Sequence, residues 1–102
     1  MPLVILVTLP PDRATDLARV LVEERLAACV NIVPQMTTVY RWQGDVVVDA
    51  EALLVIKTEE DQYDALERRV TELHPYDVPE IIALPTTRTL PSYLSWLQDS
   101  VR

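Results

Sequence analysis

The sequence predicts a single α+β domain, in which short apolar strands alternate with amphipathic helices. β-Branched residues gather in short runs, and between these runs the apolar residues recur at helical spacing. The chain has 102 residues, of which 49% are hydrophobic and 25% are charged. This length and composition are typical of one globular domain, so we treat residues 1–102 as a single unit.

The first two predicted elements are a buried strand and a helix. Residues 3–9 (LVILVTL) form a β-branched apolar run that ends at Pro10-Pro11, as expected for a central strand. Asp12 can cap the helix that follows. Apolar residues then keep the spacing of one helical face until about residue 27, at Ala14, Leu17, Ala18 and Leu21.

A long β-hairpin is predicted over residues 30–42 and 46–57. Gln43-Gly44 supplies the turn, and Gly44 is the only glycine of the chain, which indicates a position that needs a positive φ. Pro34 predicts a bulge or an edge position in the first strand. Both strands exceed about ten residues, the upper end of the usual range. We therefore expect part of the hairpin to project or to pair with another chain.

The turn also fixes which residues share a face of the hairpin. A two-residue loop places Trp42 opposite Asp45. Alternation then puts one set of side chains on one face, namely Tyr40, Trp42, Asp49, Glu51, Leu53, Val55 and Lys57. Glu51 and Lys57 are charges within an apolar run, and they lie about 20 Å apart along the strand, too far to pair. They are either exposed edge charges or residues of a cleft between subunits.

The remaining elements complete a ferredoxin-like plan. Residues 58–61 (TEED) resemble a capping box, and a helix follows that stops before Pro75 with His74 in its last turn. Residues 80–84 form a short strand, and Pro91 opens a last helix. The order matches a βαββαβ sandwich with a long hairpin and an extra C-terminal helix.

Charge and composition exclude several classes of function. The net charge is -7 and no basic stripe is present, so we expect no nucleic-acid partner. The apolar run at residues 3–9 is too short to span a bilayer and no basic residue precedes it, which favours a cytoplasmic protein without a membrane partner. No glycine-rich phosphate loop and no nucleophile with a base is recognisable, so we predict that the chain is not an enzyme.

Cys29 and His74 are the only residues of their types, and they are the candidate metal ligands. Cys29 is either a small buried hydrophobic residue or a thiolate ligand. His74 is either a cation favoured at a helix C-terminus or a ligand. One His and one Cys cannot form a closed soft-ligand site within one chain, so any metal site must recruit carboxylates or another subunit.

Five short motifs follow one another along the chain, at residues 23–34 (EERLAACVNIVP), 40–44 (YRWQG), 74–76 (HPY), 78–81 (VPEI) and 93–96 (YLSW). Together they resemble the CutA family of divalent-cation tolerance proteins. The resemblance covers essentially the whole chain, with the motifs in the right order. It implies a ferredoxin-like protomer assembled as a tight homotrimer, in which the long hairpins pair with neighbouring subunits. The architecture is similar to that of the PII signalling proteins, which bind small ligands between subunits.

The resemblance also implies a site. Trp42, Glu51, Lys57, Tyr76 and Glu80 match the cleft residues of the family, and Tyr40 shares the hairpin face with Trp42. Some relatives bind copper, but this chain has Val7 and Leu73 where some of them place a Cys and a second His. Of that ligand set only His74 remains, so we expect at most weak binding of a divalent metal ion such as copper.

The function implied is tolerance of copper and other divalent cations, exerted by binding a metal ion or a small ligand, with PII-like signalling as an extension. Two alternatives stay open at this point. One is an enzyme acting at the intersubunit cleft, with Glu51 or Glu80 as base and Lys57 as an electrostatic group. The other is a trimer that serves as a scaffold for another protein.

Overall fold

An antiparallel sheet of four strands lies at the centre of the structure, a computed structural model that describes residues 1–102. Its strands are β1 (Pro2–Leu9), β2 (Cys29–Trp42), β3 (Asp45–Glu59) and β4 (Ile81–Pro85), in the order β2-β3-β1-β4. The helices are α1 (Ala14–Glu23), α2 (Tyr63–Leu73) and α3 (Pro91–Ser100), with 3-10 turns η1 (Pro11–Arg13) and η2 (Glu60–Gln62). The predicted α+β class and the ferredoxin-like order of elements are confirmed.

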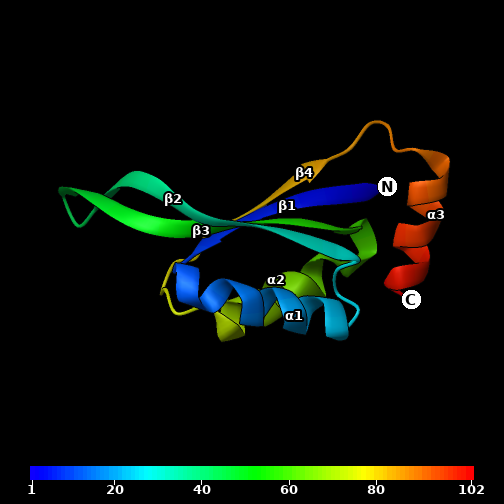
Figure 1. Cartoon of the computed structure of the whole chain (residues 1–102), viewed down its shortest axis with the longest axis horizontal. Helices are drawn as coiled ribbons and strands as arrows, with labels where there is room; N and C mark the ends of the chain where they lie inside the picture. Colours follow the sequence, from blue (N-terminus) through cyan, green and yellow to red (C-terminus); the bar gives the residue numbers. More distant parts are fainter.

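Helices α1 and α2 lie on one face of the sheet, as Figure 1 shows. Alternation directs the same face of β1 and β3 towards them, and the core forms there. Its fully enclosed residues come from β1, α1, β3 and α2 and include Ile5, Val7, Leu9, Leu21, Leu54, Ile56, Leu66 and Val70. Burying such a side chain is worth about 1.5–3 kcal/mol, so this layer holds the protomer together.

The opposite face of the sheet carries no helix (Figure 1). Val4 and Leu6 on β1 and Val55 on β3 are only partly buried there. On β4 the exposed fractions reach 48% for Ile82 and 45% for Leu84. One face of the sheet is therefore packed and the other is an open apolar surface. None of the three helices has both the length and the apolarity needed to traverse a bilayer.

The hairpin of β2 and β3 has the predicted turn and register. Trp42 pairs with Asp45, and Gln43 and Gly44 have φ of 50° and 86°. Nothing lies within 4 Å of a Cβ added at Gly44, so the backbone angle rather than crowding selects glycine there. The register shifts between Val33 and Met36, which confirms the bulge expected at Pro34.

The far half of the hairpin extends beyond the helices as an arm, which we define as residues 37–50 (Figure 1). The molecule measures 45 × 25 × 22 Å, and the arm accounts for its elongation. On the arm Val39, Val46 and Val48 have exposed fractions of 64%, 64% and 63%. This confirms that the hairpin is too long for the helices of one protomer to cover.

Several local predictions were wrong. Asp12 does not cap the first helix, because it lies within η1 and no side chain caps α1. The first helix ends at Glu23 rather than near residue 27, because Arg25 takes a φ of 61° and turns the chain. The sequence TEED is not a capping box, because pairing with β1 carries β3 through to Glu59. Thr58 is instead fully buried in the strand, where its Oγ1 donates to the Leu26 carbonyl at 2.7 Å.

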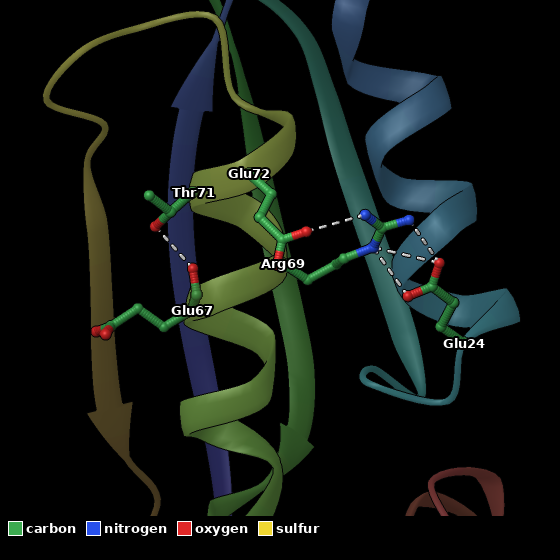
Figure 2. A network of polar contacts seen from close by, with 5 residues as sticks. All are labelled: Glu24, Glu67, Arg69, Thr71 and Glu72. Carbon is green, nitrogen blue, oxygen red and sulfur yellow. Dashed lines mark hydrogen bonds and ion pairs between the residues drawn. The ribbon is translucent and has the colours of Figure 1, made fainter.

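Polar contacts join the two helices on their outer surface (Figure 2). Arg69 of α2 donates through Nε and Nη2 to the carboxylate of Glu24, just beyond α1, at 3.0 and 2.9 Å. Its Nη1 lies 3.4 Å from Glu72. The guanidinium lowers the pKa of Glu24 below its ordinary value, mainly through the hydrogen bond.

At the end of the sheet remote from the arm, Leu97 and Val101 pack on Ala28.

Candidate functional site

A cleft of about 450 Å³ lies at the base of the arm, as its lining residues show. Strands β1, β2 and β3 form its floor, and the loop between α2 and β4 forms its wall. The cleft is lined by Thr8, Thr38, Tyr40, Trp42, Glu51, Pro75, Tyr76, Asp77, Val78 and Glu80. The structure thus brings together five of the residues proposed from the sequence, namely Tyr40, Trp42, Glu51, Tyr76 and Glu80.

Glu51 is the most buried charged residue of the cleft, with an exposed fraction of 5%. The hydroxyl of Tyr76 donates to its Oε2 at 3.0 Å, whereas Oε1 accepts no hydrogen bond within the chain and is not enclosed. Burial, together with the hydrogen bond to Glu51, raises the pKa of Tyr76 to about 12. Tyr76 therefore stays a donor, and Glu51, which lines the cleft, keeps one oxygen without a partner in the chain.

Two aromatic residues of β2 extend the cleft along the arm. The hydroxyl of Tyr40 donates to the carboxylate of Asp49 at 2.6 Å, which fixes the ring and raises the pKa of the phenol. Trp42 makes no hydrogen bond with its side chain and has an exposed fraction of 46%. The two rings offer apolar faces next to a buried carboxylate.

His74 fixes the loop that forms the wall of the cleft. Its ring is buried, Nε2 lies 2.7 Å from the Thr8 carbonyl, and Nδ1 accepts the amide of Tyr76 at 3.1 Å. A carbonyl only accepts and an amide only donates, so the proton is assigned to Nε2. The ring also packs against Tyr76 with centroids 4.7 Å apart. His74 lies just after the last turn of α2, in extended backbone, rather than within the turn.

The structure does not bring the two candidate metal ligands together. Nε2 of His74 donates to the Thr8 carbonyl and Nδ1 accepts the Tyr76 amide, so the ring has no free lone pair for a metal ion. Cys29 lies at the other end of the sheet, opposite Lys57 and beside Tyr93 of α3. No group of three or more His, Cys, Asp or Glu side chains is placed to hold a metal ion. The donors of one chain therefore do not fit a closed copper site.

Lys57 is the one proposed cleft residue that lies elsewhere in the protomer. It stands on the open face of the sheet, at the end remote from the arm, because the alternation of β3 places it six residues beyond Glu51. Its Nζ donates to the side-chain oxygen of Asn31 and to the Val55 carbonyl, the latter at 3.3 Å. Glu51 and Lys57 share a face, as predicted, but not a site within one chain.

Sequence reasoning missed several residues of the cleft, and two signals could have found them. Thr8 is the only polar residue of the run LVILVTL, and a polar residue at the end of a buried strand often marks a site. Asp77 and Val78 lie between Tyr76 and Glu80, so a loop that carries both of these residues to the cleft must carry the intervening ones near it.

The fold and the cleft define the class: a ferredoxin-like protein with one open sheet face, a projecting arm and a cleft at the base of the arm. The solved structure of the "PII-like protein CutA from Nostoc sp." superposes with a TM-score of 0.93, at 33% identity, covering 100% of this chain and 98% of that one. The Thermus thermophilus divalent cation tolerance protein (Cut A1) superposes with a TM-score of 0.96, at 51% identity, covering 100% of both chains.

Sequence comparison gives the family. The family model described as "CutA1 divalent ion tolerance protein" matches residues 3–100. The "Divalent-cation tolerance protein CutA" of Thermus thermophilus is 53% identical over 98 residues, 95% of each chain. The "Protein CutA homolog" of Xenopus laevis is 49% identical over 96 residues, and this match covers 93% of the present chain and 64% of the Xenopus protein. The chain belongs to the CutA1 divalent ion tolerance family.

Proposed function

We propose that the protein acts as a homotrimer that binds a small ligand in the cleft at the base of the arm, and that this binding underlies a part in divalent-cation tolerance. The observation that carries the proposal is the arrangement of Glu51 and Tyr76. A carboxylate with an exposed fraction of 5% is held by one hydrogen bond and keeps a free oxygen in a cleft of about 450 Å³. Small-molecule sites have this character: a preformed concavity with a few oriented polar groups.

The open surfaces of the protomer support the trimer. The uncovered face of the sheet, on which the cleft lies, is apolar, and so are the exposed valines on the opposite face of the arm. Larger apolar patches of this kind mark interaction surfaces. Arms that pair with neighbouring protomers would cover both surfaces and close the cleft from a second side. A measured mass of about three times 11.6 kDa by light scattering is the expected result, and a monomer at micromolar concentration contradicts it.

Lys57 has a role in this assembly. A partly buried ammonium on an open face is suited to meet a neighbouring protomer, where its charge would complete a site that one chain leaves unfinished. We expect Lys57→Ala to weaken assembly or ligand binding without unfolding the protomer. Arg88→Ala is the control, because it also removes a positive charge but lies outside the cleft and the sheet.

Binding of a divalent metal ion is proposed as weak. The chain offers carboxylates and no free imidazole pair, and such oxygen donors hold copper less tightly than nitrogen and sulfur donors. Calorimetric titration of copper into the trimer should give weak binding. Tight stoichiometric binding that survives His74→Ala would place a metal site elsewhere. The cytoplasmic location stays a prediction, and we propose that the protein acts by binding rather than by catalysis.

A combined panel of metal ions and metabolites, read by thermal shift, tests the proposed function. A metabolite that stabilises the trimer and loses its effect in Glu51→Gln is the expected result. A ligand that stabilises the trimer equally in both forms binds outside the cleft and contradicts the proposal. A partner protein that binds the trimer while no small ligand does would favour the scaffold alternative.

A further inference from the structure

The cleft has an uneven charge. The ionisable side chains on its lining are three carboxylates, those of Glu51, Asp77 and Glu80, together with two tyrosines. No lysine, arginine or histidine lines it. Burial raises the pKa of Tyr76 to about 12, so the tyrosines stay neutral and the cleft is negative at neutral pH.

Glu51 is the charge that most needs a counterpart. Its side chain is more than nine-tenths buried, one oxygen has only the Tyr76 hydroxyl as a donor, and the other has no partner in the chain. The free oxygen is not enclosed, so a ligand in the cleft can reach it. A ligand that brings a positive charge there would gain a charge-assisted hydrogen bond to a poorly solvated carboxylate.

The aromatic residues of the cleft also favour a positively charged ligand. The rings of Tyr40, Trp42 and Tyr76 line the cleft together with the carboxylates, with exposed fractions of 37%, 46% and 37%. The face of an aromatic ring attracts a cation, most strongly for tryptophan. Rings beside carboxylates are the surroundings in which proteins hold ammonium groups that carry apolar substituents.

The geometry favours an organic cation over an inorganic one. A metal ion needs several donors within about 2–2.6 Å of one point, and no group of three or more acidic, His or Cys side chains is placed to hold a metal ion. The volume of about 450 Å³ lies within the usual range for small-molecule sites. An extended ligand can reach the carboxylates and the rings together, whereas a bare ion cannot.

We propose that the cleft binds a small organic cation, an amine or quaternary ammonium compound whose positive head faces Glu51 and whose apolar part contacts the rings of Tyr40 and Trp42. The inference rests on the proposed function of the cleft as a ligand site and names the class of its ligand. A neighbouring protomer that placed its Lys57 in the cleft would not reverse the charge, because three carboxylates line it.

Choline and its uncharged carbon isostere, dimethylbutanol, are the matched probes. Trp96→Phe leaves Trp42 as the only tryptophan and makes its fluorescence a direct report on the cleft. Choline should change this fluorescence saturably, with an affinity that falls as salt is added, and dimethylbutanol should not. Glu51→Gln should weaken choline binding about tenfold or more, since it removes the charge and keeps the shape.

Glu23→Gln on α1 is the control, because it removes one carboxylate from an exposed helix outside the cleft. Circular dichroism and the mass of the assembly verify that each variant is folded. Where Glu51→Gln is not folded, Glu80→Gln replaces it, because Glu80 lines the cleft and makes no hydrogen bond with its side chain. The proposal is supported if Glu51→Gln, or Glu80→Gln in its place, weakens the binding of choline while Glu23→Gln leaves it unchanged.

The remaining outcomes separate this inference from the proposed function. If an anionic metabolite binds in the cleft and choline does not, the ligand class is wrong and the ligand site stands. Equal binding of choline and dimethylbutanol shows a merely apolar site and overturns the inference. Displacement of choline by a stoichiometric amount of calcium or copper shows that the cleft prefers an inorganic ion, with the same consequence. An intact trimer that binds none of these probes overturns both.

Discussion

The two halves of β3 differ sharply in burial. On a single face of this strand, Leu54 and Ile56 are fully buried, whereas Val46 and Val48 have exposed fractions of 64% and 63%. The residues are all apolar, so β propensity does not separate the halves. The halves differ because the helices are shorter than the strand. Helices α1 and α2, with 10 and 11 residues, are about 15 Å long, whereas the 15 residues of β3 span about 50 Å. The strands of the hairpin therefore extend beyond the layer of helices α1 and α2.

The cleft lies at the boundary of the two halves. Ala52 is the first residue of β3 under the helices, and Glu51 is its neighbour on the opposite face. Here the sheet passes from a packed to an uncovered state, and the loop fixed by His74 closes one side. A site at such a boundary combines a rigid floor with access to solvent and to other chains.

The largest expected effect comes from placing charge on the arm. Val46→Lys together with Val48→Lys should leave the protomer folded and separate the proposed trimer, because each ammonium that the trimer would bury costs several kcal/mol. Light scattering measures the mass, and circular dichroism checks the fold. Glu23→Lys on α1 is the control for an exposed lysine. A trimer that persists with both lysines would mean that the arm stays in solvent.

The next largest effect is expected from a substitution in the half of β3 that packs under the helices. Leu54→Ala should lower the free energy of unfolding by about 3 kcal/mol, because it leaves a cavity in the core. Val48→Ala should change it by less than about 0.5 kcal/mol in the dissociated protomer. Guanidinium unfolding at low protein concentration compares the two. Equal losses would show that the arm is packed within its own chain.

A smaller effect is expected at the boundary. Tyr76→Phe should cost about 1 kcal/mol, since it removes one hydrogen bond to Glu51 in a partly exposed place. Folding raises the pKa of Tyr76 from 10.0 to about 12. The contribution of the phenol to the free energy of unfolding is therefore complete below pH 10 and is lost as the pH rises through about 12. The difference in tyrosinate absorbance between wild type and Tyr76→Phe measures this titration. A phenol that titrates near pH 10 would contradict the contact.

The smallest effect belongs to the helix surface in Figure 2. Arg69→Ala removes a solvent-exposed pair and should change stability only slightly, and less at high salt. The pair lowers the pKa of Glu24 from its ordinary value of 4.5, so its contribution is present above that pH and is lost as the pH falls through the lowered value. Urea unfolding of both forms at neutral and acidic pH tests this. A loss that grows on acidification would contradict it.

Local rules explain which parts of the fold the sequence predicts well. The turn at Gln43-Gly44 and the bulge at Pro34 depend on backbone angles of single residues, and a two-residue loop then sets the whole register. Helix ends are harder, because the stop at Arg25 requires a positive φ that no glycine signals. Thr58 reads as a cap from its neighbours, but tertiary pairing with β1 overrides this local preference.

The candidate site was only partly accessible to such rules. Alternation places Glu51 and Lys57 on one face, and motif resemblance adds Tyr76 and Glu80. Neither shows that the loop after α2 folds back onto β1, because this depends on the hydrogen bond between His74 and the Thr8 carbonyl, across a sequence separation of 66 residues. The burial of Glu51 follows from that three-dimensional arrangement, whereas the distance of Lys57 from the cleft follows from its spacing along β3.

The order of strands in the sheet has a consequence for synthesis. β1 is made first, yet it occupies the interior of the sheet, between β3 and β4. Its first hydrogen-bonding partners in β3 follow about fifty residues later, which takes several seconds at about 5–20 residues per second. During this interval the run LVILVTL leaves the ribosome without a neighbouring strand. Nascent chains of this protein therefore depend on α1, or on a chaperone, to shield their most apolar segment until the hairpin has been translated.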